Sequence, residues 1–376
     1  MTEPSDAVKR ARQRRATGAM DDFDGKKLSL ARRLAKTSRT SLAAAAHVSA
    51  AAITQFERND AKPTNSVVAS LALTLGLPKE FFQAGLPTAQ IPTSAAHFRS
   101  LRATSASSRE QALAFAELAY STVEALESYL DFPPVDMPDI ALYSDAASSI
   151  PDIAAEVRSQ LDVPAGPIGS MVRLLEARGV IVLRLPPQTV DDKVDAFSTG
   201  DGSRPLVILS STKDDKARSR FDAAHELGHL VMHRGVEPGS QVVETEAHVF
   251  ASNFLMPADE IVHDLPRRLD WDMLLLAKRK WGVSLAALVH RARDLDMLSD
   301  LLYQRANRML RTEGYPERGS LGAPEQPSLL QMAMELLDEE QISFEEFASD
   351  NRLPELQTRL VIAAGSEQRK KLVVSD

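Results

Sequence analysis

The chain of 376 residues contains no cysteine, which excludes a disulfide framework, a thiolate metal site and a cysteine nucleophile. Any metal ion would therefore be held by histidine and carboxylate side chains. Long apolar runs are also absent: none reaches the roughly 18 residues that span a membrane, and the polar, basic residues 1–27 lack the apolar segment of a secretory signal. We therefore expect a cytoplasmic protein without a membrane anchor.

At 376 residues the chain is long enough for two or three domains. Because 44% of its residues are hydrophobic, it can bury a sizeable core, which indicates a globular protein. The charges are distributed unevenly. Residues 1–95 carry 14 Lys or Arg and 8 Asp or Glu, whereas the remaining 281 residues carry 30 and 44. The basic front indicates that only this part of the chain meets nucleic acid. Much of its excess lies in residues 1–27, a predicted flexible arm, and a merely solvated arm explains that excess equally well.

Residues 28–85 predict a compact group of short helices. The segment LSLARRLAKT has one apolar and one basic side. The segments SLAAAA and Ala50 to Glu57 then predict two helices, with a turn at His47 and Val48 and with Ser49 as the N-cap of the second helix. A helix, a short turn and a capped helix are typical of a helix-turn-helix.

The run VSAAAITQFERNDAKPTNSVVASLALTLGLPKEFF resembles the helix-turn-helix of the phage-repressor (XRE) class. The matching positions are Val48, Ser49, Ile53, Glu57, Pro63, Leu75, Gly76 and Pro78. The resemblance implies an all-α domain that binds DNA. Three alanines stand where that class commonly has base-reading side chains, which leaves Arg39, Thr54 and Gln55 as the candidate DNA contacts. The alternative is a helix-turn-helix fold that serves as a protein-docking module.

The region that follows combines helices with a few strands. Residues 86–97 are rich in proline and polar residues and predict a linker. Residues 98–130 predict a long amphipathic helix, which would space two domains or form the face of a homodimer. The runs GVIVLRLP, VDAFSTGDGS and RPLVILSS then predict three short strands directly before another helix. We expect this helix to pack on the small sheet.

That helix contains the stretch FDAAHELGHLVMH, which includes an H-E-x-x-H motif. Residues four apart share one face of a helix, so His225 and His229 can direct their imidazoles at one metal ion. A catalytic zinc ion needs a third protein ligand. His233 cannot share an ion with His225, because eight helical residues separate them by about 12 Å. The acidic helix that follows offers two glutamates two residues apart, of which only one can face the ion.

The segments RSRFDAAHELGHLVMH and ETEAHVFASNFLMP together resemble the two motifs of the ImmA/IrrE family of zinc metallopeptidases, over roughly residues 97–315. The resemblance implies that His225, His229 and Glu244 bind Zn²⁺ and that Glu226 is the general base. His248 stands where that family usually has asparagine. Because it follows Glu244 by one turn, it is a candidate catalytic donor to the developing oxyanion, with simple packing or solvation as the alternative.

These patterns predict a mostly helical α+β protein. An all-α helix-turn-helix domain at 28–85 and a linker at 86–97 precede a zincin-like metallopeptidase domain with a small sheet at 98–315, and a linker with two short helices follows at 316–376. The resemblance implies a zinc-dependent endopeptidase that cleaves a partner repressor or antitoxin, often itself a helix-turn-helix protein. The alternative is a DNA-binding regulator or antitoxin whose metallopeptidase-like half serves sensing or dimerisation.

Overall fold

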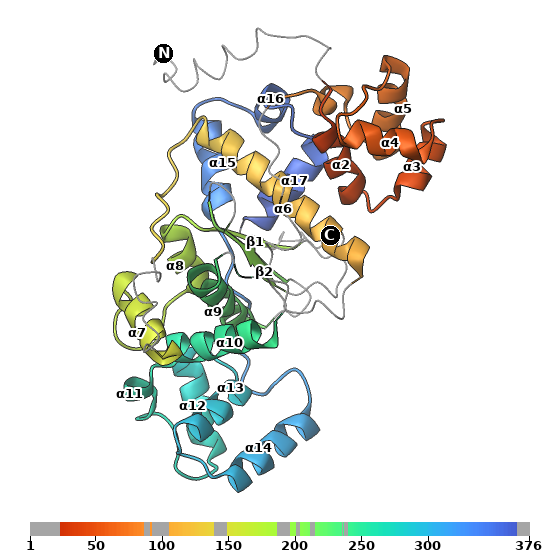
Figure 1. The fold of residues 1–376 in the computed structure, drawn as a ribbon. Coiled ribbons are helices and arrows are strands. Elements are labelled where there is room, and N and C mark those ends of the chain that lie inside the picture. The colour runs from red at the N-terminus through yellow and green to blue at the C-terminus, as the bar shows by residue number, and fades with distance from the viewer. Residues whose placement is uncertain are drawn as a thin grey trace, which may run out of the picture.

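A computed structural model describes residues 23–85, 91, 105–138, 149–185, 196–200, 204–210, 215–234, 236 and 240–366 of the chain. In this part the protein is mostly helical and contains one small sheet (Figure 1), which confirms the expected α+β class. Most of the predicted arm and linker lie outside the described residues. A search of the described helices finds none that is long and apolar enough to cross a membrane.

The N-terminal bundle contains the predicted helix-turn-helix. Its elements are α2 (Gly25–Leu34), α3 (Arg39–Ala45), α4 (Ala50–Glu57), α5 (Asn65–Leu75) and the 3-10 turn η2 (Lys79–Phe82). The turn between α3 and α4 falls at His47, whose φ of 55° ends α3 in a left-handed conformation. Ser49 then caps α4 by accepting a hydrogen bond from the Ala52 amide. Leu28, Leu42 and Ile53 are fully buried between these helices and hold them together.

The three predicted strands are present and form one mixed sheet. They are β1 (Ile181–Arg184), β2 (Phe197–Thr199) and β3 (Leu206–Leu209), in the order β1-β3-β2. Strand β3 runs parallel to β1 and antiparallel to β2. Successive side chains of a strand point to opposite faces, and both faces of this sheet are covered. Val182 and Val207 therefore enter one apolar core, whereas Ile181 and Ile208 enter another.

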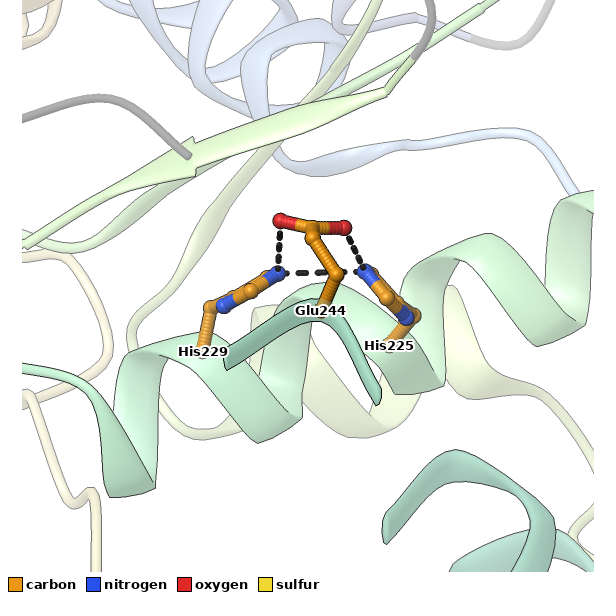
Figure 2. Close-up of side chains that lie close together, drawn as sticks. All are labelled: His225, His229 and Glu244. Carbon is orange, nitrogen blue, oxygen red and sulfur yellow. Dashed lines mark hydrogen bonds and ion pairs between the residues drawn. The ribbon is translucent and has the colours of Figure 1, made fainter. Parts of the chain in front are cut away.

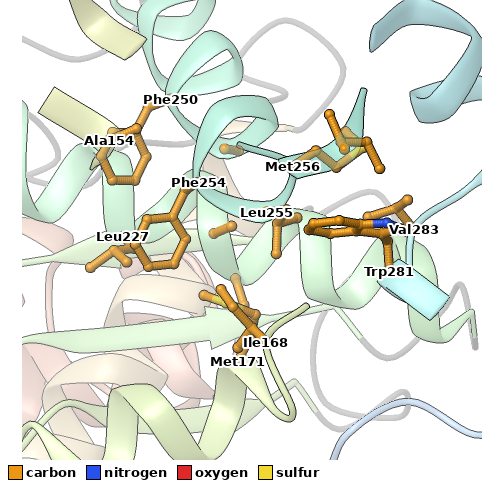
Figure 3. Close-up of a cluster of buried hydrophobic side chains, with 14 of the residues drawn as sticks. Ala154, Ile168, Met171, Leu227, Phe250, Phe254, Leu255, Met256, Trp281 and Val283 are labelled. Carbon is orange, nitrogen blue, oxygen red and sulfur yellow. The ribbon is translucent and has the colours of Figure 1, made fainter. Parts of the chain in front are cut away.

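The larger core lies on the face of the sheet that carries the H-E-x-x-H helix. Its helices are α7 (Ile150–Gln160), α8 (Met171–Ala177), α9 (Lys216–Met232), α10 (Gln241–Leu255), α11 (Ala258–Ile261), α12 (Trp271–Trp281), α13 (Leu285–Asp294) and α14 (Asp300–Glu313). Figure 3 shows Phe250 and Phe254 of α10 beside Leu227 of α9, with Trp281 and Val283 further along. These side chains are almost fully buried, so the core fixes how α10 lies against α9.

The long helix α6 (Ala106–Glu127) is buried along most of its length, whereas the sequence predicted an amphipathic helix. On one side it packs against α2, where Arg33 forms an ion pair with the buried Glu117. On the other side it covers the sheet, and Tyr120 donates a hydrogen bond to the Thr199 carbonyl. The helix therefore lies between the N-terminal bundle and the sheet, and the chain itself covers the face that a homodimer would have used.

Up to residue 366, where the description ends, the C-terminal region contains three helices, whereas the sequence predicted two: α15 (Leu329–Glu339), α16 (Phe344–Asp350) and α17 (Glu355–Ala364). Arg352 adopts a left-handed φ of 52° and Pro354 follows, so the acidic segment is divided into α16 and α17. Phe347 of α16 contacts Tyr129 with ring centroids 5.8 Å apart, and α17 packs on α6. Helices α16 and α17 therefore dock on the same chain. In the segment that precedes α15, Glu325 pairs with the buried Arg220 of α9.

Candidate metal centre

Helix α9 places two histidines one turn apart beneath the sheet. Asp215 caps its N-terminus by accepting a hydrogen bond from the Arg218 amide. His225 and His229 are 1% and 2% exposed, and their Nε2 atoms lie 3.1 Å apart. Because both rings point to the same side of the helix, two nitrogens with metal-binding capacity meet at one point (Figure 2).

Helix α10 brings Glu244 to the same point. Its Oε2 lies 3.3 Å from His225 Nε2, and its Oε1 lies 3.4 Å from His229 Nε2 (Figure 2). A glycine allows this close approach of the two helices, since a Cβ at Gly228 would lie 2.9 Å from the Phe250 ring. Burial by itself raises the pKa of Glu244, but hydrogen bonds with the two histidines outweigh it and hold that pKa well below its usual value.

The distances and the types of atom fit a metal ion. Two ligand atoms that each lie about 2.1 Å from a tetrahedral ion are about 3.4 Å apart. His225 Nε2 and His229 Nε2 are 3.1 Å apart, and they lie 3.3 and 3.4 Å from two different oxygens of Glu244, Oε2 and Oε1. With one ligand atom from each residue, the three atoms lie within 4.8 Å of one another. Two imidazoles and one carboxylate are also a ligand set of catalytic zinc sites that retain a fourth position for water. Within the described residues, these three form the group of histidine and carboxylate side chains that could hold a metal ion.

Glu226, the predicted general base, is fully buried beside His225. The hydroxyl of Ser198, which is 1% exposed on β2, donates a hydrogen bond of 2.7 Å to its Oε2. The sheet therefore holds the carboxyl group of Glu226 in one orientation. Ser198 could not be predicted from the sequence, because 28 residues separate it from Glu226 and only the packing of β2 on α9 brings the two together.

His233, which the sequence excludes as a ligand shared with His225, lies on the far side of the His229 ring. Its Nδ1 is 3.0 Å from His229 Nδ1, and its Nε2 is 3.0 Å from Glu246 Oε2. Burial lowers the pKa of His233, and the hydrogen bond with Glu246 opposes that shift only in part. A neutral His233 donates from Nε2 to Glu246 and accepts at Nδ1 from His229. In this tautomer the Nε2 lone pair of His229 would be available to a metal ion, in place of the hydrogen bond to Glu244 that the other tautomer donates.

The structure places His248 one turn beyond Glu244, on the exposed side of α10. Its ring lies against Phe221, with centroids 4.8 Å apart, and faces His290 at 6.1 Å. These contacts support the packing that the sequence analysis gave as its alternative. The role of His248 as an oxyanion donor stays a prediction.

The three candidate DNA contacts lie on α3 and α4. Arg39 is half exposed and donates from Nε to Glu57 Oε2 at 2.6 Å. The hydroxyl of Thr54 donates to the Ala50 carbonyl at 3.1 Å, whereas Gln55 is exposed. Exposure alone does not test contact with DNA, so the three roles stay predictions.

Comparison with protein families identifies the same two parts of the chain. Residues 175–293 match the family model described as the IrrE N-terminal-like domain, and residues 28–82 match the model described as helix-turn-helix. The expected two-part architecture is therefore confirmed. No curated protein matches the chain. The two matches support a DNA-binding regulator that carries a metallopeptidase-like domain, of a kind that is typically metal-dependent.

Proposed function

We propose that this chain, which joins a helix-turn-helix to an IrrE N-terminal-like segment, is a zinc-dependent endopeptidase that cleaves a partner repressor or antitoxin. One observation carries the proposal: one ligand atom each from His225, His229 and Glu244 lie within 4.8 Å of one another, where they can surround one metal ion. Glu226, which follows His225 on α9 and accepts a hydrogen bond from Ser198 of β2, would supply the general base that peptide hydrolysis needs.

The roles of the residues follow from their chemistry. Zinc held by the three side chains would lower the pKa of a bound water towards about 7 and polarise a peptide carbonyl. Glu226 accepts the proton of the attacking water and later delivers it to the departing amine. Its burial and the hydrogen bond from Ser198 restrict the carboxyl group, so that it need not reorganise during the transfer. His248 is proposed as a donor to the oxyanion.

The helix-turn-helix supports the proposal that the substrate is a protein bound to DNA. Through Arg39, Thr54 and Gln55, residues 28–85 would bring the peptidase to an operator or to the repressor bound there. The bundle is anchored to the rest of the chain, because Arg33 pairs with Glu117 and Gln111 donates to the Leu34 carbonyl at 2.9 Å. Binding at DNA and cleavage would therefore involve one connected body.

The test uses Glu226→Gln, which keeps the ligands and removes the base. The purified wild type and the variant should each hold about one zinc ion, measured by elemental analysis. In cells that carry the variant, a helix-turn-helix protein should accumulate intact, and proteomics against the wild type would identify it. Normal transcriptional regulation in cells with Glu226→Gln would overturn the proposed peptidase function. It would favour a regulator whose metallopeptidase-like half serves sensing or dimerisation.

A further inference from the structure

A cavity of about 440 Å³ lies between α9, α10, α13 and α14. Its size falls in the range of about 300–1,000 Å³ that is typical of ligand pockets. Neither the three candidate ligands nor Glu226 lines it, so it is distinct from the metal centre itself.

The cavity adjoins the metal centre along both helices that build the centre. Phe221 precedes His225 by one turn of α9, and His248 follows Glu244 by one turn of α10. Both Phe221 and His248 line the cavity and their rings touch each other. Side chains one turn apart have Cβ atoms about 5–6 Å apart, so the cavity begins about one residue length from the ligands. A peptide with its scissile bond at the metal could insert a neighbouring side chain here.

Part of the cavity wall is a continuous row of four rings. Phe221 and His248 have centroids 4.8 Å apart, His248 and His290 are 6.1 Å apart, and His290 and Tyr303 are 6.0 Å apart. Two of these contacts are edge-to-face, which is a favoured geometry for aromatic pairs. An incoming aromatic ring would extend the row by the same type of contact.

The charged groups of the wall are already engaged within the chain. Asp215 caps α9, Asp222 lies 3.5 Å from Arg218, and Glu317 pairs with Lys278 at 2.6 Å. Glu317 also accepts hydrogen bonds from the first amides of α13. A charged side chain that entered the cavity would lose hydration without gaining a dedicated counter-charge. The wall therefore favours an uncharged ring over an acidic or basic side chain.

We propose that this cavity is a subsite that binds an uncharged aromatic side chain of the substrate, adjacent to the bond that is cut. The proposal rests on the proposed peptidase function, but its first test does not require activity. Small amides can report binding to the full chain by ligand-observed NMR. The probes are N-acetyl-phenylalanine amide, N-acetyl-glutamate amide and N-acetyl-lysine amide.

The phenylalanine amide should bind at least about tenfold more tightly than either charged amide. Ala287→Trp fills the cavity from α13 and should weaken its binding by at least about tenfold. The matched control is Ala258→Trp, an exposed alanine outside the cavity wall, which should bind like the wild type. If Ala287→Trp does not fold, Phe221→Ala removes the first ring of the row and should have the same direction of effect. Equal binding of the three amides, or binding that these variants leave unchanged, overturns the subsite.

A second test separates the subsite from the proposed function. The zinc-loaded protein is incubated with a peptide library, and the cleaved bonds are read by mass spectrometry. Enrichment of cleavage next to phenylalanine or tyrosine supports the subsite. Cleavage without this enrichment overturns the subsite but still agrees with the proposed peptidase function. If no peptide is cleaved, the proposed function is contradicted for these substrates, and the amide measurements alone decide whether the cavity binds aromatic groups.

Discussion

The helix-turn-helix bundle and the metal centre each contain a trio of ionisable side chains, but the two trios are built in opposite ways. In the bundle, Arg32 and Arg39 donate to the buried Glu57 at 2.5 and 2.6 Å, so two permanent positive charges share one permanent negative charge. In the metal centre, two imidazole nitrogens and a carboxylate face a common point. Burial alone therefore does not distinguish a structural cluster from a chemical one. The types of atom that face each other distinguish a cluster that stabilises the fold from one that can bind a metal ion.

The largest expected effect breaks this ion-paired trio. Glu57→Gln leaves the guanidinium of Arg32 buried without its counter-charge, and should lower the free energy of unfolding by about 3–5 kcal/mol. The matched change, Glu244→Gln, should abolish the zinc-dependent rise in stability while costing the zinc-free protein much less. Urea denaturation of both variants, with zinc and with a chelator, measures this contrast. Equal losses in the chelated state would contradict it.

A second change in the bundle concerns Lys27, which is 5% exposed. Burial lowers its pKa from 10.5 to about 8, with Asp24 opposing the shift and Arg352 adding to it. Between pH 8 and 10.5 the unfolded chain binds more protons, so the stability of the wild type rises with pH in that window.

Lys27→Met should therefore stabilise the protein by about 3 kcal/mol at pH 7, and its advantage should shrink as the pH rises from 8 to 10.5. Denaturation at pH 7 and pH 10 gives the two values. An advantage of the same size at both pH values would assign the effect to packing rather than to charge.

A smaller effect is expected around the metal centre. His233→Ala removes the acceptor that orients His229, and should lower zinc affinity about 10–100-fold. Glu246→Ala should act in the same direction, and the double variant should lose less than the sum of the two free energies because both residues belong to one chain of hydrogen bonds. Competition with a chelator measures the affinities, and His263→Ala, an exposed histidine, is the control. Unchanged affinity would leave His233 a packing residue only.

The smallest effect on the fold is expected for Arg39→Ala, the exposed member of the ion-paired trio. Arg32 still neutralises Glu57, so stability should change by about 1 kcal/mol or less. Binding to DNA should weaken for all sequences alike, and the slope of log affinity against log salt should fall by about one if Arg39 contacts a phosphate. Gln55→Ala should instead change the preference for sequence. Titrations at several salt concentrations distinguish the two, and an unaltered slope for Arg39→Ala removes it from the interface.

The features that could be predicted from the sequence are those that local spacing encodes. The four-residue interval puts His225 and His229 on one helix face, and Ser49 marks the start of α4 as predicted. Alternating β-rich runs predicted the three strands. Spacing alone could not identify Glu244 rather than Glu246 as the third ligand, because both residues lie on one helix and either could have faced α9. The resemblance to the metallopeptidase family identified Glu244.

Contacts between residues that are distant in the chain depend on how the helices and strands pack together. The contacts of Ser198 with Glu226 and of His233 with Glu246 join different elements, and no periodicity of one segment reports them. The burial of α6 also depends on its neighbours, because α2, α17 and the sheet cover it from different parts of the chain. Local patterns specify the face of each helix, whereas packing of the buried cores selects the partner that each face meets.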